Sequence, residues 1–302
     1  MLDPHELYEV AGELPALDGP VLIQALTGFV DAGSAIQLAR ENLLENLDNE
    51  VVATFDLDQL LDYRSRRPPM IFVADHFESY EDPVLALHLV RDQLGTPFLL
   101  LTGPEPDLQW ERFIAAVTEL IERLGVKLTI GLNAIPMAVP HTRPAGLTAH
   151  ATDKSLLGDH ESWLQRVQVP ASVGNLLELR LGQNGHDALG YAAHVPHYLA
   201  QTGYPAASEL LLDSVSGNTG LALPTGKLRE AAKLVREEVD KQIADDEQAG
   251  RLVTSLEAQY DAFLRGRANN LLVDSDSALP TAEELGAELE RFLAEQTRDD
   301  SA

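Results

Sequence analysis

Residues 21–44, VLIQALTGFVDAGSAIQLARENLL, decide the fold class of this chain. The first six of these residues are apolar except for Gln24 and have the length of a buried strand. The turn TGFVDAGS follows, and Ile36, Ala39 and Leu43 then recur at helical spacing. A strand that passes through a glycine-bearing turn into an amphipathic helix is typical of the opening unit of an α/β sheet.

Strand-like and helix-like segments continue to alternate to about residue 220. Further strands are predicted at residues 51–57, 70–75, 85–92, 98–103, 127–133, 147–152 and 186–195. The segments 85–92 and 98–103 form a predicted hairpin, so the sheet is mixed. After residue 220 only helical patterns remain. The sequence therefore predicts a three-layer α/β/α core domain over residues 1–220 and a helical C-terminal extension over residues 221–302.

Composition excludes several classes of function. The chain has 302 residues, with 22 Lys+Arg against 48 Asp+Glu and a formal net charge of −26. Binding to nucleic acid or to an anionic membrane surface depends on lysine and arginine, so neither partner is expected. The absence of cysteine excludes disulfides, thiolate metal sites and a cysteine nucleophile. The first residues resemble no leader peptide and no long apolar run follows, so we expect a cytoplasmic protein.

The turn at residues 28–34 is the first candidate ligand site, through Asp31, Gly33 and Ser34. Backbone N–H groups at the start of a helix can hold an anion. The turn matches neither dinucleotide-binding nor P-loop patterns and has no lysine. The alternative is that Asp31 or Ser34 caps the helix while the glycines permit a tight turn.

Two later segments add candidate ligand-binding residues. His141 and Arg143 lie in the proline-rich loop PHTRPAG. One hypothesis is that His141 is an acid/base group and that the guanidinium of Arg143 binds a carboxylate. The alternative is that both side chains hold the loop together by hydrogen bonds to its backbone. His194, in HVPHY, either joins such a site or is a buried structural histidine. The sequence contains no GxSxG, SxxK or HExxH motif. It therefore predicts no catalytic residue, no metal site and no cofactor.

Five ordered motifs resemble one known family. They are TGFVDAGSA (27–35), DYRSRRPPM (62–70), LLLTGPEPDLQW (99–110), IPMAVPHTRP (135–144) and AAHVPHYLAQTGYPAASELL (192–211). In this order they resemble the actinobacterial branch of the PAC2 family, the proteasome assembly chaperone 2 superfamily. The resemblance implies a phosphorylase/hydrolase-like α/β/α fold, self-association, and a link to proteasome assembly in eukaryotic and archaeal relatives.

Two functional hypotheses follow from the resemblance. The first is a non-catalytic chaperone-like or scaffolding homo-oligomer, with proteasome subunits as possible partners. A trimer is the expected oligomeric state, and a dimer is the second choice. Leu285, Leu289 and Phe292, on a predicted last helix, are its candidate partner-binding residues. The second hypothesis is a small-molecule-binding protein or an enzyme, with Asp31, His141, Arg143 and His194 at one edge of the sheet. Fold analogy alone does not choose between them.

Overall fold

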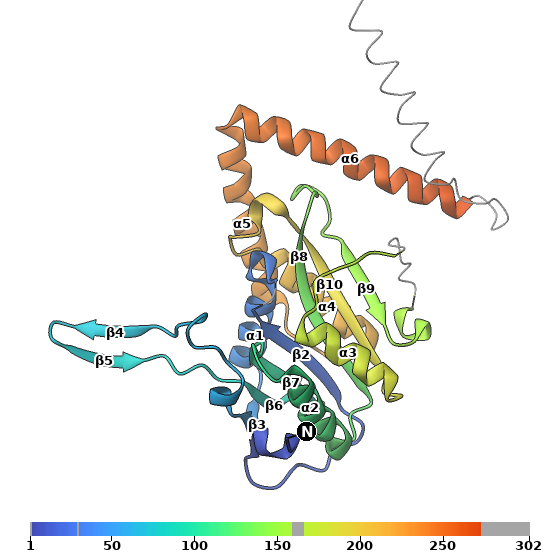
Figure 1. Ribbon diagram of the computed structural model, residues 1–302. Coiled ribbons are helices and arrows are strands. Elements are labelled where there is room, and N and C mark those ends of the chain that lie inside the picture. Colours follow the sequence, from blue (N-terminus) through green and yellow to red (C-terminus); the bar gives the residue numbers. More distant parts are fainter. Residues whose placement is uncertain (1, 29, 159–165, 273–302) are drawn as a thin grey trace, which may run out of the picture. The chain divides into compact units, whose positions relative to one another are not determined.

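The computed structural model describes residues 2–28, 30–158 and 166–272 of the chain (Figure 1). The chain forms two compact units, Met1–Leu256 and Glu257–Ala302. The sheet and its helices belong to the first unit, and the described part of the second is the end of helix α6 (Glu247–Leu272). The division into a core over 1–220 and an extension over 221–302 stays a prediction. Leu285, Leu289 and Phe292 lie outside the described residues.

An eight-stranded mixed sheet runs through the first unit. Its strands are β1 (Tyr8–Val10), β2 (Val21–Thr27), β3 (Asn49–Phe55), β6 (Ala86–Arg91), β7 (Pro97–Pro104), β8 (Leu128–Met137), β9 (Leu147–Ala151) and β10 (Ala188–Pro196). Their order is β1-β3-β6-β7-β2-β8-β10-β9. The central strands β7, β2, β8 and β10 are parallel, and the strands on either side pair antiparallel.

Helices cover both faces of this sheet (Figure 1). On one face, α1 (Ala35–Asn46) packs on β2, α4 (Pro205–Thr219) packs on β10 and on α1, and α5 (Gly226–Ala244) packs on α4. Ile23 and Ala25 of β2 belong to the core on this face. On the other face, α2 (Trp110–Leu124) and α3 (Val173–Gln183) share a core with Leu22 and Leu26. Alternate residues of β2 thus enter opposite cores, as the period of a strand requires. The predicted three-layer fold, with C-terminal helices after it, is confirmed.

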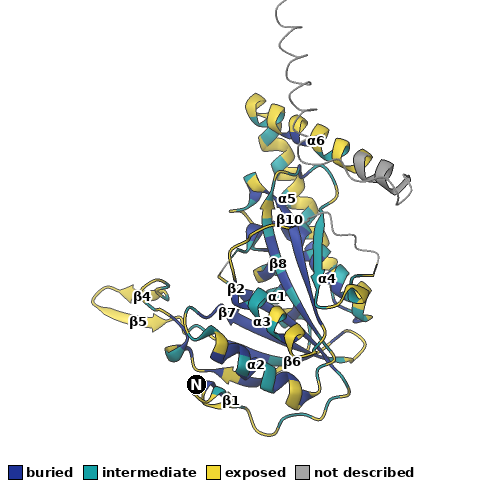
Figure 2. Cartoon of the chain, turned by 45° about the vertical axis from the view of Figure 1, so that its right-hand side comes forward, coloured by how far each residue is buried: buried dark blue, intermediate teal, exposed yellow. Residues whose placement is uncertain are grey.

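One predicted strand has a different place in the fold. The apolar segment 70–75 was expected to belong to the main sheet, and that expectation is wrong. Its residues form β4 (Met70–Val73), which pairs only with β5 (His76–Tyr80) in a separate two-stranded sheet. Every residue of β4 and β5 is exposed (Figure 2). An apolar run predicts a strand, but it does not reveal what covers that strand.

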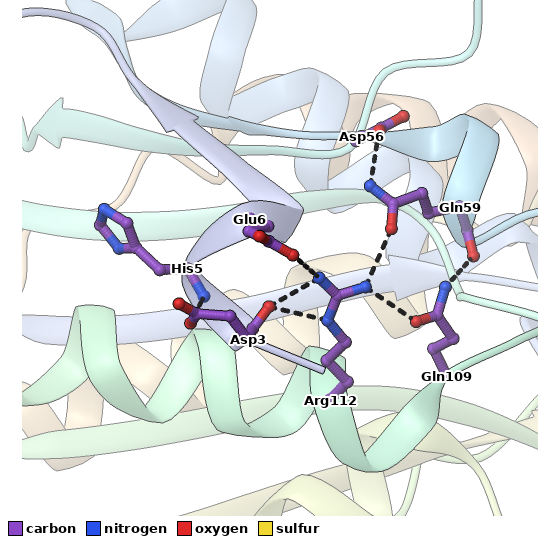
Figure 3. Close-up of polar contacts among 7 residues, drawn as sticks. All are labelled: Asp3, His5, Glu6, Asp56, Gln59, Gln109 and Arg112. Atoms are coloured by element: carbon purple, nitrogen blue, oxygen red, sulfur yellow. Dashed lines mark hydrogen bonds and ion pairs between the residues drawn. The ribbon is translucent and has the colours of Figure 1, made fainter. Parts of the chain in front are cut away.

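A buried arginine ties the N-terminal segment to α2 and to the loop after β3 (Figure 3). The Nε and Nη2 atoms of Arg112 donate to the carbonyl oxygen of Asp3 at 2.8 and 2.6 Å. Its Nη1 donates to the side-chain oxygens of Gln59 at 2.9 Å and Gln109 at 3.0 Å. Nη2 also lies 3.1 Å from a carboxylate oxygen of Glu6. Arg112 therefore joins three segments that are distant in the sequence.

No helix within the described part of the chain combines the length and the apolar character needed to cross a membrane.

Candidate functional site

The carboxylate of Asp31 lies at the start of α1. Its two oxygens accept the backbone N–H groups of Ile36 at 2.7 Å and Gln37 at 3.0 Å. Burial raises the pKa of Asp31, although these hydrogen bonds and the charge of Arg40 act in the opposite direction. Because Asp31 already occupies these two N–H groups, the geometry favours a helix cap over an anion site at this turn.

Gly33 and Ser34 connect this turn to the segment before α4. Gly33 has φ of 67°, its N–H donates to the carbonyl of Ala200 at 2.9 Å, and its carbonyl accepts the N–H of Tyr204 at 2.8 Å. A Cβ atom at Gly33 would lie 2.6 Å from the Cβ of Tyr204. Ser34 also has a positive φ, of 49°. The tight turn therefore allows two backbone segments to come close together.

His141 is buried and forms hydrogen bonds at both ring nitrogens. Its Nε2 lies 3.0 Å from a carboxylate oxygen of Asp240 on α5, and its Nδ1 lies 2.7 Å from the Tyr198 hydroxyl. An ionised carboxylate only accepts, so Nε2 carries the proton, and in the neutral ring Nδ1 accepts from the hydroxyl. The same hydroxyl accepts the backbone N–H of His141 at 2.9 Å. This network joins the loop after β8 to α5 and to the short turn that follows β10.

We expect Tyr198→Phe to lower the free energy of unfolding by about 1–3 kcal/mol, because the buried N–H and ring nitrogen of His141 lose their partner. Asp240→Asn is the matched control. The Asp240 side chain is half-exposed and its amide oxygen would still accept from Nε2, so the expected loss is below about 1 kcal/mol. Urea denaturation of both variants measures the difference. Equal losses would contradict the assigned role of the hydroxyl.

Arg143 and His141 line the same cavity, which has a volume of about 330 Å³. The cavity is bounded by the loop after β8, by residues around the start of α4 and by α5. Asp31, Gly33, Ser34 and His194 are not among its lining residues. The structure thus brings together two of the six candidate ligand-binding residues at this cavity.

His194 lies within β10 and contacts the start of β9. Its Nε2 is 2.7 Å from the Thr148 hydroxyl, and its backbone N–H donates to the carbonyl of Gly146 at 2.9 Å. A Cβ at Gly146 would lie 2.7 Å from the His194 ring, so glycine permits this close approach. Burial lowers the pKa of His194. These contacts favour a structural histidine at this position.

A second polar cluster, which the sequence did not indicate, lies between β2, β8 and α3. Its cavity is small, about 40 Å³, and Gln24, Glu105, His150 and Glu178 are among its lining residues. Glu105 accepts the N–H of Val173 at the start of α3, and burial raises the pKa of its carboxyl group. The Nδ1 of His150 lies 2.8 Å from a carboxylate oxygen of Glu178. The pairing joins residues from different elements, which no local motif encodes.

Among the residues that the structure describes, no group of three or more histidine, aspartate or glutamate side chains is arranged to hold a metal ion.

A mixed sheet between two helical layers, with an exposed hairpin and C-terminal helices, defines an α/β/α class of protein. The sequence matches the PAC2 family over residues 25–243, and the chain belongs to that family. A search of curated proteins finds no match.

Three solved structures illustrate the similarity. A Mycobacterium tuberculosis protein of unknown function is 51% identical, with a TM-score of 0.85 over 88% of this chain and 92% of its own. A Corynebacterium glutamicum protein of unknown function is 41% identical, with a TM-score of 0.82 over 85% and 98%. A Mycobacterium tuberculosis proteasome-assembly chaperone homologue shares the fold at 24% identity, with a TM-score of 0.71 over 77% and 99%.

Proposed function

We propose that this protein is a non-catalytic, chaperone-like or scaffolding member of the PAC2 family, and that it works as a homo-oligomer. The observation that carries the proposal is the exposed hairpin of β4 and β5. Two comparisons support the proposal. The chain belongs to the PAC2 family, and it shares its fold with a protein named as a proteasome-assembly chaperone homologue.

The hairpin exposes several large apolar side chains. Phe72 and Phe77 are cross-strand partners with ring centroids 5.2 Å apart, and they are 57% and 65% exposed. Met70 and Tyr80 form the next exposed pair. A two-stranded sheet without a covering layer is marginally stable in water, and exposed apolar patches of this kind mark interaction sites. The hairpin therefore requires a partner.

The family resemblance, which implies self-association, points to a second copy of this chain as that partner. The hairpin segment carries exposed charges of both signs, with Arg64 and Arg67 before β4 and with Asp75, Glu78, Glu81 and Asp82 in or beside the hairpin. Pairing of these opposite charges between two copies is compatible with self-association. A trimer is the state we expect, followed by a dimer.

Light scattering after size-exclusion chromatography tests self-association. We expect wild type to be oligomeric at about 10 μM, and the double variant Phe72→Glu/Phe77→Glu to be monomeric. Truncating aromatic residues that an interface buries costs about 2 kcal/mol or more each, which together weakens association by at least about 700-fold. The control is Leu94→Glu, since Leu94 is 80% exposed in the turn between β6 and β7 and should leave the oligomer intact. A monomeric wild type, or an oligomeric double variant, would disprove the role of the hairpin.

The proposal also concerns which protein the oligomer binds. Proteasome subunits are the partners that the family resemblance implies. Affinity capture from native lysate, followed by mass spectrometry, should recover proteasome α-subunits with wild type and with Leu94→Glu. The monomeric variant should recover several-fold less. Failure to recover proteasome subunits with wild type would remove them from the proposal and leave the self-association result standing.

A further inference from the structure

The cavity that His141 and Arg143 line has the dimensions of a ligand site. Its volume of about 330 Å³ lies within the range of small-molecule pockets, roughly 300–1,000 Å³. It is much larger than the cavity of about 40 Å³ beside α3. It is formed within the first compact unit, by residues from three separate segments.

The charge at this cavity is opposite to that of the whole chain. Four cationic side chains line it, Arg143, Arg229, Lys233 and Arg236, against the single carboxylate of Glu209. The three on α5 are spaced four and three residues apart, which places them on one face of the helix. In a chain of net charge −26, a lining with four cations and one carboxylate is unusual.

Internal ion pairs account for only part of this positive charge. Arg229 lies 2.6 Å from a carboxylate oxygen of Glu209 through Nε and 3.9 Å from one of Asp213 through Nη2, and Arg236 Nε lies 3.9 Å from Asp240. Lys233 forms no ion pair with any residue that the structure describes. An anion placed beside Lys233 would therefore meet a cation whose charge no described carboxylate compensates.

The remaining walls are largely apolar. Leu199 and Tyr204 contribute from the segment before α4, and Val235 and Val239 contribute from α5. Burial raises the pKa of Tyr204 to about 12, so its phenol is neutral at physiological pH. Apolar walls beside a cluster of cations suit a ligand with an apolar body and one anionic group.

We propose that this cavity binds a small organic anion, with a carboxylate or phosphate group near Lys233 and the α5 arginines and with an apolar body against Leu199, Val235 and Val239. The His141 network is a positioning element, because its bonds to Tyr198 and Asp240 fix the loop against α5. The site is independent of the hairpin, so the inference does not depend on self-association.

Ligand-observed NMR with three probes that share one aromatic ring tests the proposal on the full chain. The probes are phenyl phosphate, benzoate and the neutral benzyl alcohol. A probe of this size binds with a Kd on the order of 1 mM, so we expect saturable binding of at least one anion in that range. Benzyl alcohol should bind at least about tenfold more weakly. The preference between the two anions distinguishes a phosphate ligand from a carboxylate ligand. Absence of binding by both anions would overturn the proposal.

Matched variants on α5 locate the site. Lys233→Met should weaken anion binding about tenfold, the change expected when one charge-assisted hydrogen bond is lost. Lys241→Met removes the same charge from the same helix outside the cavity and should change binding less than about twofold. Ala232→Trp should block the cavity while keeping every charge, and circular dichroism checks that this variant is folded. Equal weakening by Lys233→Met and Lys241→Met would identify a nonspecific charge effect and overturn the assignment.

Discussion

Arg112→Ala is expected to lower the free energy of unfolding by about 3–5 kcal/mol, the range for removing one partner from a buried charged network. The Arg112 side chain is only 6% exposed. Alanine would leave the Asp3 carbonyl and the amide oxygens of Gln59 and Gln109 without this donor, and it would leave a void where the guanidinium lies. Urea denaturation, followed by far-ultraviolet circular dichroism, measures the loss.

The control for this experiment is Glu6→Gln. Glu6 also contacts Arg112, but its side chain is 68% exposed, so removing its charge should cost less than about 1 kcal/mol. A loss below about 1 kcal/mol in Arg112→Ala would mean that the N-terminal segment does not depend on this network.

Gly33→Ala is expected to cost about 2–5 kcal/mol. A left-handed backbone costs a non-glycine residue roughly 1–2 kcal/mol, and overpacking adds about 1–3 kcal/mol. Both apply at Gly33, where φ is 67° and a new Cβ would lie 2.6 Å from the Cβ of Tyr204. The backbone there cannot move freely, because Gly33 is hydrogen-bonded to both Ala200 and Tyr204.

Gly125→Ala separates the two contributions. Gly125 has a similar φ of 64° at the end of α2, but no atom outside its chain neighbours lies within 4 Å of its added Cβ. Its expected cost is therefore the backbone part alone, about 1–2 kcal/mol. Equal losses at the two positions, measured by urea denaturation, would show that the contact with Tyr204 relaxes without cost.

Much of the fold could be predicted because its signals are local. The apolar run of β2, the helical spacing in α2 and the glycines after α2 and α4 each indicate an element from its own residues. The place of β4 could not be predicted in this way. A strand covered by helices and a strand exposed in a separate hairpin have similar apolar runs, and only the tertiary structure separates them.

Less of the candidate site could be predicted, because its residues come together from distant parts of the sequence. His141 and Arg143 stand out in a proline-rich loop, and they do lie at one cavity. Asp240, which pairs with His141, is 99 residues away in the sequence. The cations of α5 carry no sequence signal of a site, because the loop that meets them is distant in the chain. Asp31 and His194 looked equally distinctive, yet their contacts are those of a helix cap and a buried β-strand histidine.

The position of the hairpin in the chain has an evolutionary consequence. Thr54 of β3 lies opposite Ala86 of β6, so the chain leaves the main sheet and returns to it at adjacent positions. The intervening hairpin contributes no strand to that sheet. Its length and its side chains can therefore diverge between paralogues without new compensating changes in the two cores. Related chains that share a cell could in this way acquire separate assembly preferences while keeping the same scaffold.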